Sequence, residues 1–329
     1  MLRFFRSYQT NVIVTTLLIG VASWLYMLIE SDLSFSDKYG AFMFVALSGW
    51  FANAQWLYVW FGLFLFLLAA ILMIFANARL HLTDKLSYLP TLCYILLIAG
   101  VPEIHLFNPA LIASILLLTG FILLAGAFES ERISYRFFTA PAFISVAAFF
   151  YQYMYMYMLV VWIVIALLRP GYWREWVFSI LGFALPFFFA FSWFFLLDDD
   201  YTRLGVFFEE ILTIQRVMPS LSAITIIFIV TCVLLFVISF VYMLRYVGSK
   251  KVIFRNRYYV MVLIAVVTAG MIFIVPDTLP QAWYLLAFPM SFVMANYLTT
   301  IKSKRWGNIV LSLLFAGAIV AQTVFLSTN

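Results

Sequence analysis

Charged side chains in this 329-residue chain stand at the borders of apolar runs and not inside them. Ten such runs are bounded by charged residues, and all fourteen Asp and Glu residues lie at a border. A bilayer core about 30 Å thick takes roughly 20 apolar residues of helix to cross, and runs of that size recur along the chain. With 66% hydrophobic and 10% charged residues, the sequence predicts an all-α, polytopic transmembrane helical bundle, a single integral membrane domain over residues 1–329.

Eleven helices are expected from the apolar runs. The first run follows Arg3 and Arg6 and lacks a small-x-small cleavage site, so we expect a retained helix and not a cleaved signal. The expected ranges are 11–29, 55–77, 86–102, 108–127, 137–150, 153–169, 176–196, 223–246, 258–276, 281–299 and 306–326.

The basic residues fall unevenly on the two sides of this arrangement. Sixteen of the nineteen Lys and Arg residues lie on the side of the N-terminus, which leaves Lys38, Arg203 and Arg216 on the other side. Because Lys and Arg are enriched in cytoplasmic loops, the N-terminus is predicted to be cytoplasmic. Eleven crossings then place the C-terminus outside, in a protein of the bacterial inner (plasma) membrane.

The opposite, outer side is acidic. Its carboxylates are Glu30, Asp32, Asp37, Glu103, Asp198, Asp199, Asp200, Glu209, Glu210 and Asp277. One interpretation is that Asp and Glu simply fill outer loops, since they contribute little to topology. The other is a carboxylate-rich site that binds a metal, activates a hydroxyl or holds a cationic partner. His105, close to Glu103 in the sequence, would either join such a site or serve as a turn residue.

Two outer loops carry most of these charges. Residues 30–54 begin with charged side chains and continue into the uncharged, aromatic stretch 40–52. That stretch is expected to lie in the membrane interface as a partly buried helix. Residues 197–222 place acidic and basic side chains around an amphipathic core. If they have no role in a site, we expect this loop to be a lid-like connector between two helices.

Residues 137–168 form a single uncharged tract, too long for one crossing and short for two full ones. Gln152 and the tyrosines around it indicate a tight outer turn between two short helices, with a depression opening to the outer face. Tyr151, Tyr153 and Tyr155 are then expected either in an interfacial aromatic belt or on a surface that binds a ligand.

The order of these features resembles the C-superfamily of glycosyltransferases, polytopic enzymes that transfer sugars from polyprenyl-phosphate donors on the outer membrane face. Glu-Ser-Asp at 30–32 opens the first outer loop, and Leu-Leu-Arg-Pro at 167–170 closes the paired short helices. Later, Tyr-Leu-Leu-Ala-Phe-Pro at 284–289 is similar to a Tyr-Leu stretch of that superfamily, with one residue fewer before the proline. Segments 79–88 and 173–186 are similar to a bacterial multi-pass membrane family of uncharacterised function.

The resemblance implies an outer-face glycosyltransferase that uses a polyprenyl-phosphate-linked sugar donor. Its catalytic base would be Glu30 or Asp32, because an acceptor hydroxyl is a weak nucleophile until a positioned carboxylate takes its proton. A basic side chain would meet the charge of the leaving lipid phosphate. The residues expected to bind substrate are Lys38, Arg203, Arg216, Tyr151, Tyr153 and Tyr155, and those expected to hold a divalent cation or position the acceptor are Asp198, Asp199 and Asp200.

Enzymes of that superfamily usually carry larger outer loops or an added soluble domain that binds the acceptor. A membrane protein partner, a small acceptor or a non-catalytic relative would each be consistent with the short loops of this chain. Two other classes of function therefore stay open. One is a non-catalytic membrane subunit or scaffold of an envelope assembly complex, and the other is a transporter of lipid or lipid-linked sugar.

The residue inventory argues against several other chemistries. His81 and His105 are the only histidines and are expected on opposite sides, which is too few for a multi-His metal site. Cys93 and Cys232 lie inside apolar segments, so neither a disulfide nor a redox pair is indicated. An ion-coupled transporter would ordinarily carry an ionisable residue in the middle of a membrane-spanning helix. None of the expected helices has one there, which argues against this class of transporter. Nucleic acid is not a needed partner, because the basic residues serve cytoplasmic anchoring.

Overall fold

The computed structural model describes residues 2–7, 9–25, 41–51, 55–83, 86–105, 107–128, 134–168, 171–198, 221–248, 250–301 and 303–328. Within these ranges every regular element is helical. The α-helices are α1 (Leu2–Phe5), α2 (Thr10–Trp24), α3 (Phe42–Phe51), α4 (Gln55–Leu80), α5 (Leu89–Ala99), α6 (Pro109–Gly126), α7 (Ser134–Ala148), α8 (Met158–Leu168), α9 (Trp173–Asp198), α11 (Ala223–Val247), α12 (Val252–Ile274), α13 (Leu279–Thr300) and α14 (Lys304–Thr328). Three short 3-10 helices are η2 (Pro102–Ile104), η3 (Gln152–Tyr157) and η4 (Pro276–Thr278).

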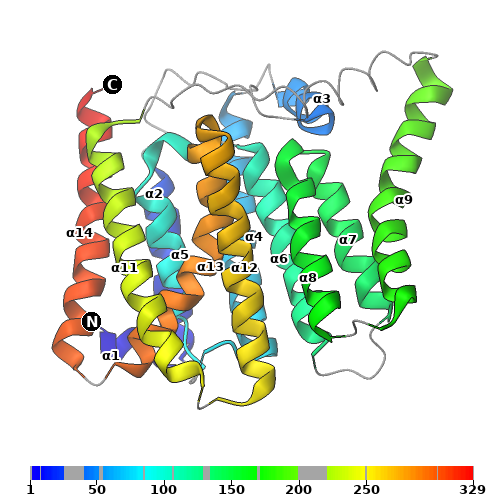
Figure 1. Cartoon of the computed structure of the whole chain (residues 1–329). Helices are drawn as coiled ribbons and strands as arrows, with labels where there is room; N and C mark the ends of the chain where they lie inside the picture. The colour runs from blue at the N-terminus through cyan, green and yellow to red at the C-terminus, as the bar shows by residue number, and fades with distance from the viewer. Residues whose placement is uncertain are drawn as a thin grey trace.

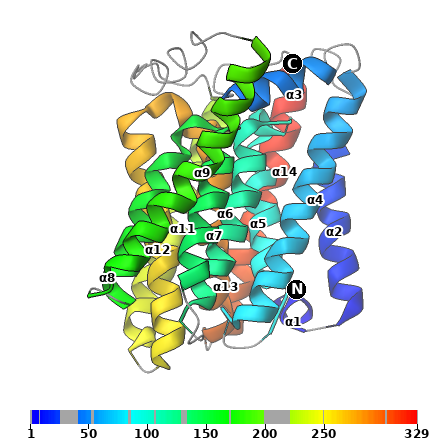
Figure 2. The ribbon, with the colours of Figure 1, turned by 90° about the vertical axis from the view of Figure 1, so that its right-hand side faces the viewer.

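Apart from the short α1 and α3, the helices run alternately up and down in one bundle (Figures 1 and 2). The N-terminus and α1 lie at one end of the bundle, which we call the α1 end. The C-terminus and α3 lie at the other, which we call the α3 end. Each of the eleven expected ranges overlaps one of these α-helices, so the all-helical fold is confirmed in the described part of the chain.

Among the described residues, six helices are long and apolar enough to cross a membrane. Their apolar segments are Trp56–Leu80, Pro109–Gly126, Trp173–Trp193, Ala223–Arg245, Val252–Ile274 and Arg305–Ser327. Thr10–Trp24, Leu89–Ala99 and Gln152–Leu168 form shorter apolar helices. The bundle thus has the segments expected of a multi-pass membrane protein.

Helices α5 and α13 form the centre of the bundle. Every residue of α5 is buried. α13 packs against α5, α6, α11 and α12, and most of its side chains are buried as well. A helix with apolar neighbours on all sides needs no polar stripe, which explains why α5 is almost entirely apolar.

The buried C-terminal end of α5 is completed by side chains from other segments. The last carbonyls of a helix have no partner within it, and an unpaired carbonyl is costly in an apolar interior. Three donors fill these positions: Trp283 Nε1 to Leu97 (2.8 Å), His105 Nε2 to Ile98 (3.0 Å) and Gln322 Nε2 to Ala99 (3.1 Å). We call this group the α5 cap, and it fixes α13 and α14 to the centre.

Two helix starts differ from the sequence prediction by more than one helical turn. α12 begins at Val252 and not at 258, because hydropathy marks entry into the hydrocarbon whereas the helix itself continues through Arg255 and Arg257. Residues 152–157 form η3 and not the first turns of an α-helix over 153–169. A 3-10 turn of this kind is common as a connector at the start of a helix.

One close helix contact depends on a glycine. A Cβ added at Gly182 of α9 would collide with the carbonyl oxygen of Phe138 in α7. The backbones of α7 and α9 therefore approach each other at a distance that only glycine allows at this position.

Candidate functional site

Most residues of the predicted outer site belong to two segments that lie outside the described part of the chain. These residues are Glu30, Asp32, Lys38, Asp199, Asp200, Arg203 and Arg216. Asp198 is the last residue of α9. The flanking helix ends are described, and α2 ends, α3 begins, α9 ends and α11 begins at the α3 end (Figure 1). Both segments are therefore attached to the same end of the bundle.

The predicted tyrosine turn is present at the α3 end, between α7 and α8. Tyr151 and Tyr153 are buried, with ring centroids 5.7 Å apart in an edge-to-face arrangement. Tyr155 is partly buried, so of these three rings it is the most accessible to a ligand. The hydroxyl groups of Tyr157 and Thr268 lie 2.7 Å apart, and this hydrogen bond holds η3 against α12.

The helix expected within residues 40–52 is present as α3, and its start is tied to the tyrosine turn. The backbone N–H of Ala41 donates to the carbonyl of Phe150 over 2.9 Å, and that of Met43 donates to Phe149 over 3.1 Å. The helix that follows the first predicted loop and the turn that carries the tyrosines thus form one structural unit.

Glu103 occupies a defined position at the α3 end. Its Oε1 atom accepts hydrogen bonds from Thr225 Oγ1 (2.7 Å) and from the backbone N–H of Ser222 (3.3 Å). Its Oε2 atom is buried and has no hydrogen-bond partner among the described residues. Glu103 thereby links η2 to the start of α11, where the second predicted loop ends.

His105 is buried and does not join the carboxylates in the described structure. Its ring stacks on Trp24 with centroids 4.9 Å apart, and its Nε2 atom contacts the carbonyl of Ile98. Burial lowers the pKa of His105 to about 3, so the imidazole is neutral at ordinary pH. Since a carbonyl can only accept, Nε2 carries the proton. Its described contacts are those of a turn residue, and whether His105 also meets the carboxylates of the two outer loops stays a prediction, since those loops lie outside the described residues.

The stretch that resembles a superfamily motif, residues 284–289, lies in the buried first half of α13. The Tyr284 hydroxyl donates to the carbonyl of Ile104 over 2.9 Å, and the neighbouring Trp283 belongs to the α5 cap. In this protein Tyr284 joins α13 to η2, and the preceding Trp283 joins α13 to α5.

Among the described residues, no group of three or more His, Cys, Asp or Glu side chains is placed to hold a metal ion. The predicted acidic cluster at 198–200 lies at and beyond the end of α9, so its ability to hold a divalent cation stays a prediction. Cys93 and Cys232 are buried free thiols.

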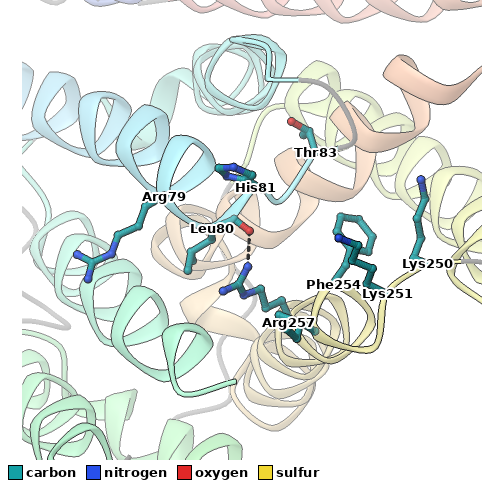
Figure 3. Close-up of a pocket in the computed structure, with 9 residues that line it drawn as sticks. Arg79, Leu80, His81, Thr83, Lys250, Lys251, Phe254 and Arg257 are labelled. Carbon is teal, nitrogen blue, oxygen red and sulfur yellow. Dashed lines mark hydrogen bonds between the residues drawn. The ribbon is translucent and has the colours of Figure 1, made fainter. Parts of the chain in front are cut away.

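A basic cavity of about 510 Å³ opens at the α1 end (Figure 3). Its lining residues come from the loop after α4 and from the start of α12: Arg79, Leu80, His81, Thr83, Lys250, Lys251, Ile253, Phe254 and Arg257. Four of these nine are Lys or Arg and none is acidic. Asp84 and Lys85, which follow Thr83, lie outside the described residues.

Arg257 is the most buried cation of this lining, with 4% of its surface exposed. Its Nη1 atom donates to the carbonyl of Leu80 over 2.6 Å, and its Nε atom donates to Ala125 over 3.2 Å. Both carbonyls lie at the C-terminal ends of helices, where backbone oxygens carry partial negative charge. Arg79 extends away from Arg257 (Figure 3). Its guanidinium lies over the ring of Phe75, with Cζ 5.8 Å from the ring centroid.

The loop after α4 is held in one conformation by two buried asparagines. Asn77 Nδ2 donates to the carbonyl of Ser87 (3.0 Å), and Asn77 Oδ1 accepts from both the N–H and the hydroxyl of Thr83 (3.1 Å each). Asn296 Nδ2 of α13 donates to the carbonyl of Leu82 over 2.7 Å. His81, which directly follows α4, has a φ of 49°, a left-handed conformation typical of the residue after a helix C-terminus.

Comparisons of the chain with models of known protein families, with curated proteins and with solved structures gave no match. The function is therefore argued from the residues of this chain. Sequence reasoning assigned the cations of the cavity to cytoplasmic anchoring. The sequence does show two loops rich in Lys and Arg. That these loops line the same cavity is visible only in the folded structure.

Proposed function

We propose that the chain is a multi-pass protein of the bacterial inner membrane, in which the eleven described helices other than α1 and α3 cross the bilayer. The described Lys and Arg residues support this, because they lie at helix ends that all belong to the α1 end. The positive-inside bias then assigns the α1 end to the cytoplasm and the C-terminus to the outside. The shorter helices fit this arrangement, since burial by neighbours removes the need to span the full lipid thickness alone.

The activity that we propose is transfer of a sugar from a polyprenyl-phosphate-linked donor at the outer face. The observation that carries it is the attachment of both predicted loops, α3 and the tyrosine turn to one end of the bundle (Figure 1). The order of a first helix, an acidic loop, an interfacial helix and paired short helices is the layout that resembles the C-superfamily of glycosyltransferases.

In this reaction Glu30 or Asp32 takes the proton of the acceptor hydroxyl. The acceptor oxygen attacks the anomeric carbon of the sugar, and the bond from that carbon to the lipid phosphate oxygen breaks. The phosphate leaves with the electron pair of the broken bond. Lys38, Arg203 or Arg216 would meet its charge in the transition state, where a preorganised cation is most effective.

The test uses the full-length protein purified gently from its native membrane. Mass spectrometry should find a retained polyprenyl phosphate or its glycosylated form. Glu30→Gln or Asp32→Asn should abolish sugar transfer while the protein still accumulates. Asp37→Asn, in the same loop but without an assigned role, is the matched control. Full activity in both Glu30→Gln and Asp32→Asn would exclude the proposed base.

A second candidate, a non-catalytic membrane subunit of an envelope assembly complex, draws support from α9. Only 11% of an 18-residue apolar stretch of α9 is buried in the bundle. Large side chains such as Phe188, Phe189 and Trp193 are exposed on this helix. Such a surface suits either lipid or a partner helix. A stoichiometric copurifying membrane protein, together with full tolerance of both carboxylate substitutions, would favour this function over sugar transfer.

A further inference from the structure

We propose that the basic cavity at the α1 end binds a phosphate-bearing anion, either the headgroup of an anionic membrane lipid or a soluble phosphate compound. This site lies at the opposite end of the bundle from the proposed sugar transfer and does not depend on that activity. Its lipid form rests on the proposed membrane orientation, because it requires the α1 end to lie at a bilayer surface.

The first argument is the charge of the lining. Arg79, Lys250, Lys251 and Arg257 all belong to the lining of one cavity and come from two segments far apart in the sequence. The Arg79 guanidinium turns toward Phe75, which leaves Lys250, Lys251 and Arg257 as the cations that carry the argument. Cations that serve only to set orientation need no shared concave site, since the bias acts on whole loops. Placing Lys250, Lys251 and Arg257 around one cavity raises the repulsion among them, and a bound anion lowers it.

The second argument is geometry. Arg257 is buried and fixed by the carbonyls of Leu80 and Ala125, so its guanidinium is held in place before a ligand arrives. Ile253 and Phe254, in the first turn of α12, also line the cavity. The first N–H groups of a helix and the positive end of its dipole favour an anion there.

The third argument is size and rigidity. A volume of about 510 Å³ lies within the range of small-ligand sites and accommodates a phosphate group with its first substituents. The wall formed by the loop after α4 is fixed by Asn77 and Asn296, so the cavity does not have to form on binding. Phosphate is favoured over a single carboxylate because its higher charge matches several cations.

The experiment compares two charge-matched double variants of the full-length protein in detergent micelles. Lys250→Gln with Lys251→Gln removes two cations of the lining, which lie near the surface and are not expected to unfold the bundle. Arg174→Gln with Arg305→Gln removes two exposed cations from the same end but outside the cavity, and is the control. Native mass spectrometry measures bound phosphatidylglycerol at rising mole fraction in phosphatidylcholine, and inorganic pyrophosphate is titrated as the soluble probe.

The wild type and the control should bind phosphatidylglycerol alike, and the lining variant should need at least about tenfold more lipid for half-saturation. Binding of pyrophosphate that is weakened in the lining variant, without retention of phosphatidylglycerol, would support the phosphate site and assign it to a soluble ligand. Equal weakening in both double variants would overturn the proposal, because it would show general surface charge. Absence of binding by either probe to the wild type would overturn it too. Sugar transfer measured on the same variants keeps the two proposals separate.

Discussion

Arg257 Nη1 donates a hydrogen bond of 2.6 Å to the carbonyl oxygen of Leu80 and thereby joins the start of α12 to the end of α4. The same guanidinium contacts Ala125 near the end of α6. Backbone carbonyls at helix C-termini have no partner within their own helix, so one buried cation satisfies positions on two helices. The same side chain thus stabilises the bundle and forms a wall of the basic cavity.

Replacement of Arg257 by Met should lower the free energy of unfolding by about 2–4 kcal/mol. Methionine keeps the volume of the apolar stem but loses two hydrogen bonds from a charged donor and leaves buried carbonyls unpaired. Chemical unfolding in mixed micelles, followed by circular dichroism, measures the change. Arg255→Met is the control, since Arg255 is less buried and does not line the cavity. A similar loss in both variants would show that the hydrogen bonds to Leu80 and Ala125 are not the cause.

Replacement of Asn77 by Ala should loosen the loop after α4 without melting the bundle. The side chain makes three hydrogen bonds to Thr83 and Ser87, and their loss should cost about 2 kcal/mol locally. Hydrogen exchange resolved by mass spectrometry should become faster at residues 81–83 and 86–88 and stay unchanged in α5. Asn11→Ala, at an exposed position of α2, should leave the same peptides protected. Unchanged exchange in the Asn77→Ala variant would contradict the role given to this side chain.

Much of the helix arrangement was predictable because a bilayer imposes a minimum apolar length and expels charge. The turn around Gln152 was predictable because the uncharged tract that contains it is too long for one crossing. The helix at 42–51 was predictable because an uncharged aromatic stretch follows a charged loop there. The start of α12 was not, because hydropathy reports the depth of a residue and not the end of its helix.

The polar contacts inside the bundle could not be predicted from patterns in the sequence. The α5 cap joins Trp283, His105 and Gln322, whose separate segments carry no signal that they meet. The basic cavity was hidden in a different way. Each of its loops fits the positive-inside bias alone, and only the fold places Arg257 against Leu80. The outer site stays a prediction, since Glu30, Asp32 and most of their proposed partners lie outside the described residues.

Glu103 provides a test at the α3 end. Glu103→Ala should destabilise the start of α11 by about 1.5–3 kcal/mol, because Thr225 Oγ1 and the Ser222 N–H lose a charged acceptor. Glu103→Gln keeps an oxygen at the same position and should cost much less. Hydrogen exchange over residues 222–228 and the unfolding free energy separate the two variants. Equal effects of Ala and Gln would mean that the charge of the carboxylate, and not its position as an acceptor, holds α11.

His105 should make the stability of the bundle depend on pH in the acidic range. Burial lowers the pKa of His105 from its ordinary value of 6.5 to about 3. Between these two values the unfolded chain binds a proton that the folded chain does not. The contribution of the neutral, buried His105 to the free energy of unfolding is therefore fully present above pH 6.5. It is lost as the pH falls toward 3, by up to about 1.4 kcal/mol per pH unit.

The variant His105→Gln isolates this contribution, because glutamine retains a donor for the Ile98 carbonyl but does not titrate. Apparent thermal midpoints in detergent, measured from pH 7.5 down to 4.5, should fall more steeply for the wild type than for His105→Gln. Carboxylates titrate in both proteins, so only the difference between the two curves reports on His105. The thermal midpoint of the wild type minus that of His105→Gln should decrease steadily below pH 6.5. If the wild type is only slightly more stable at pH 7.5, this difference should become negative at low pH. Parallel curves would mean that the ring can be protonated in place, and thus that the stacked position beside Trp24 admits water or an anion.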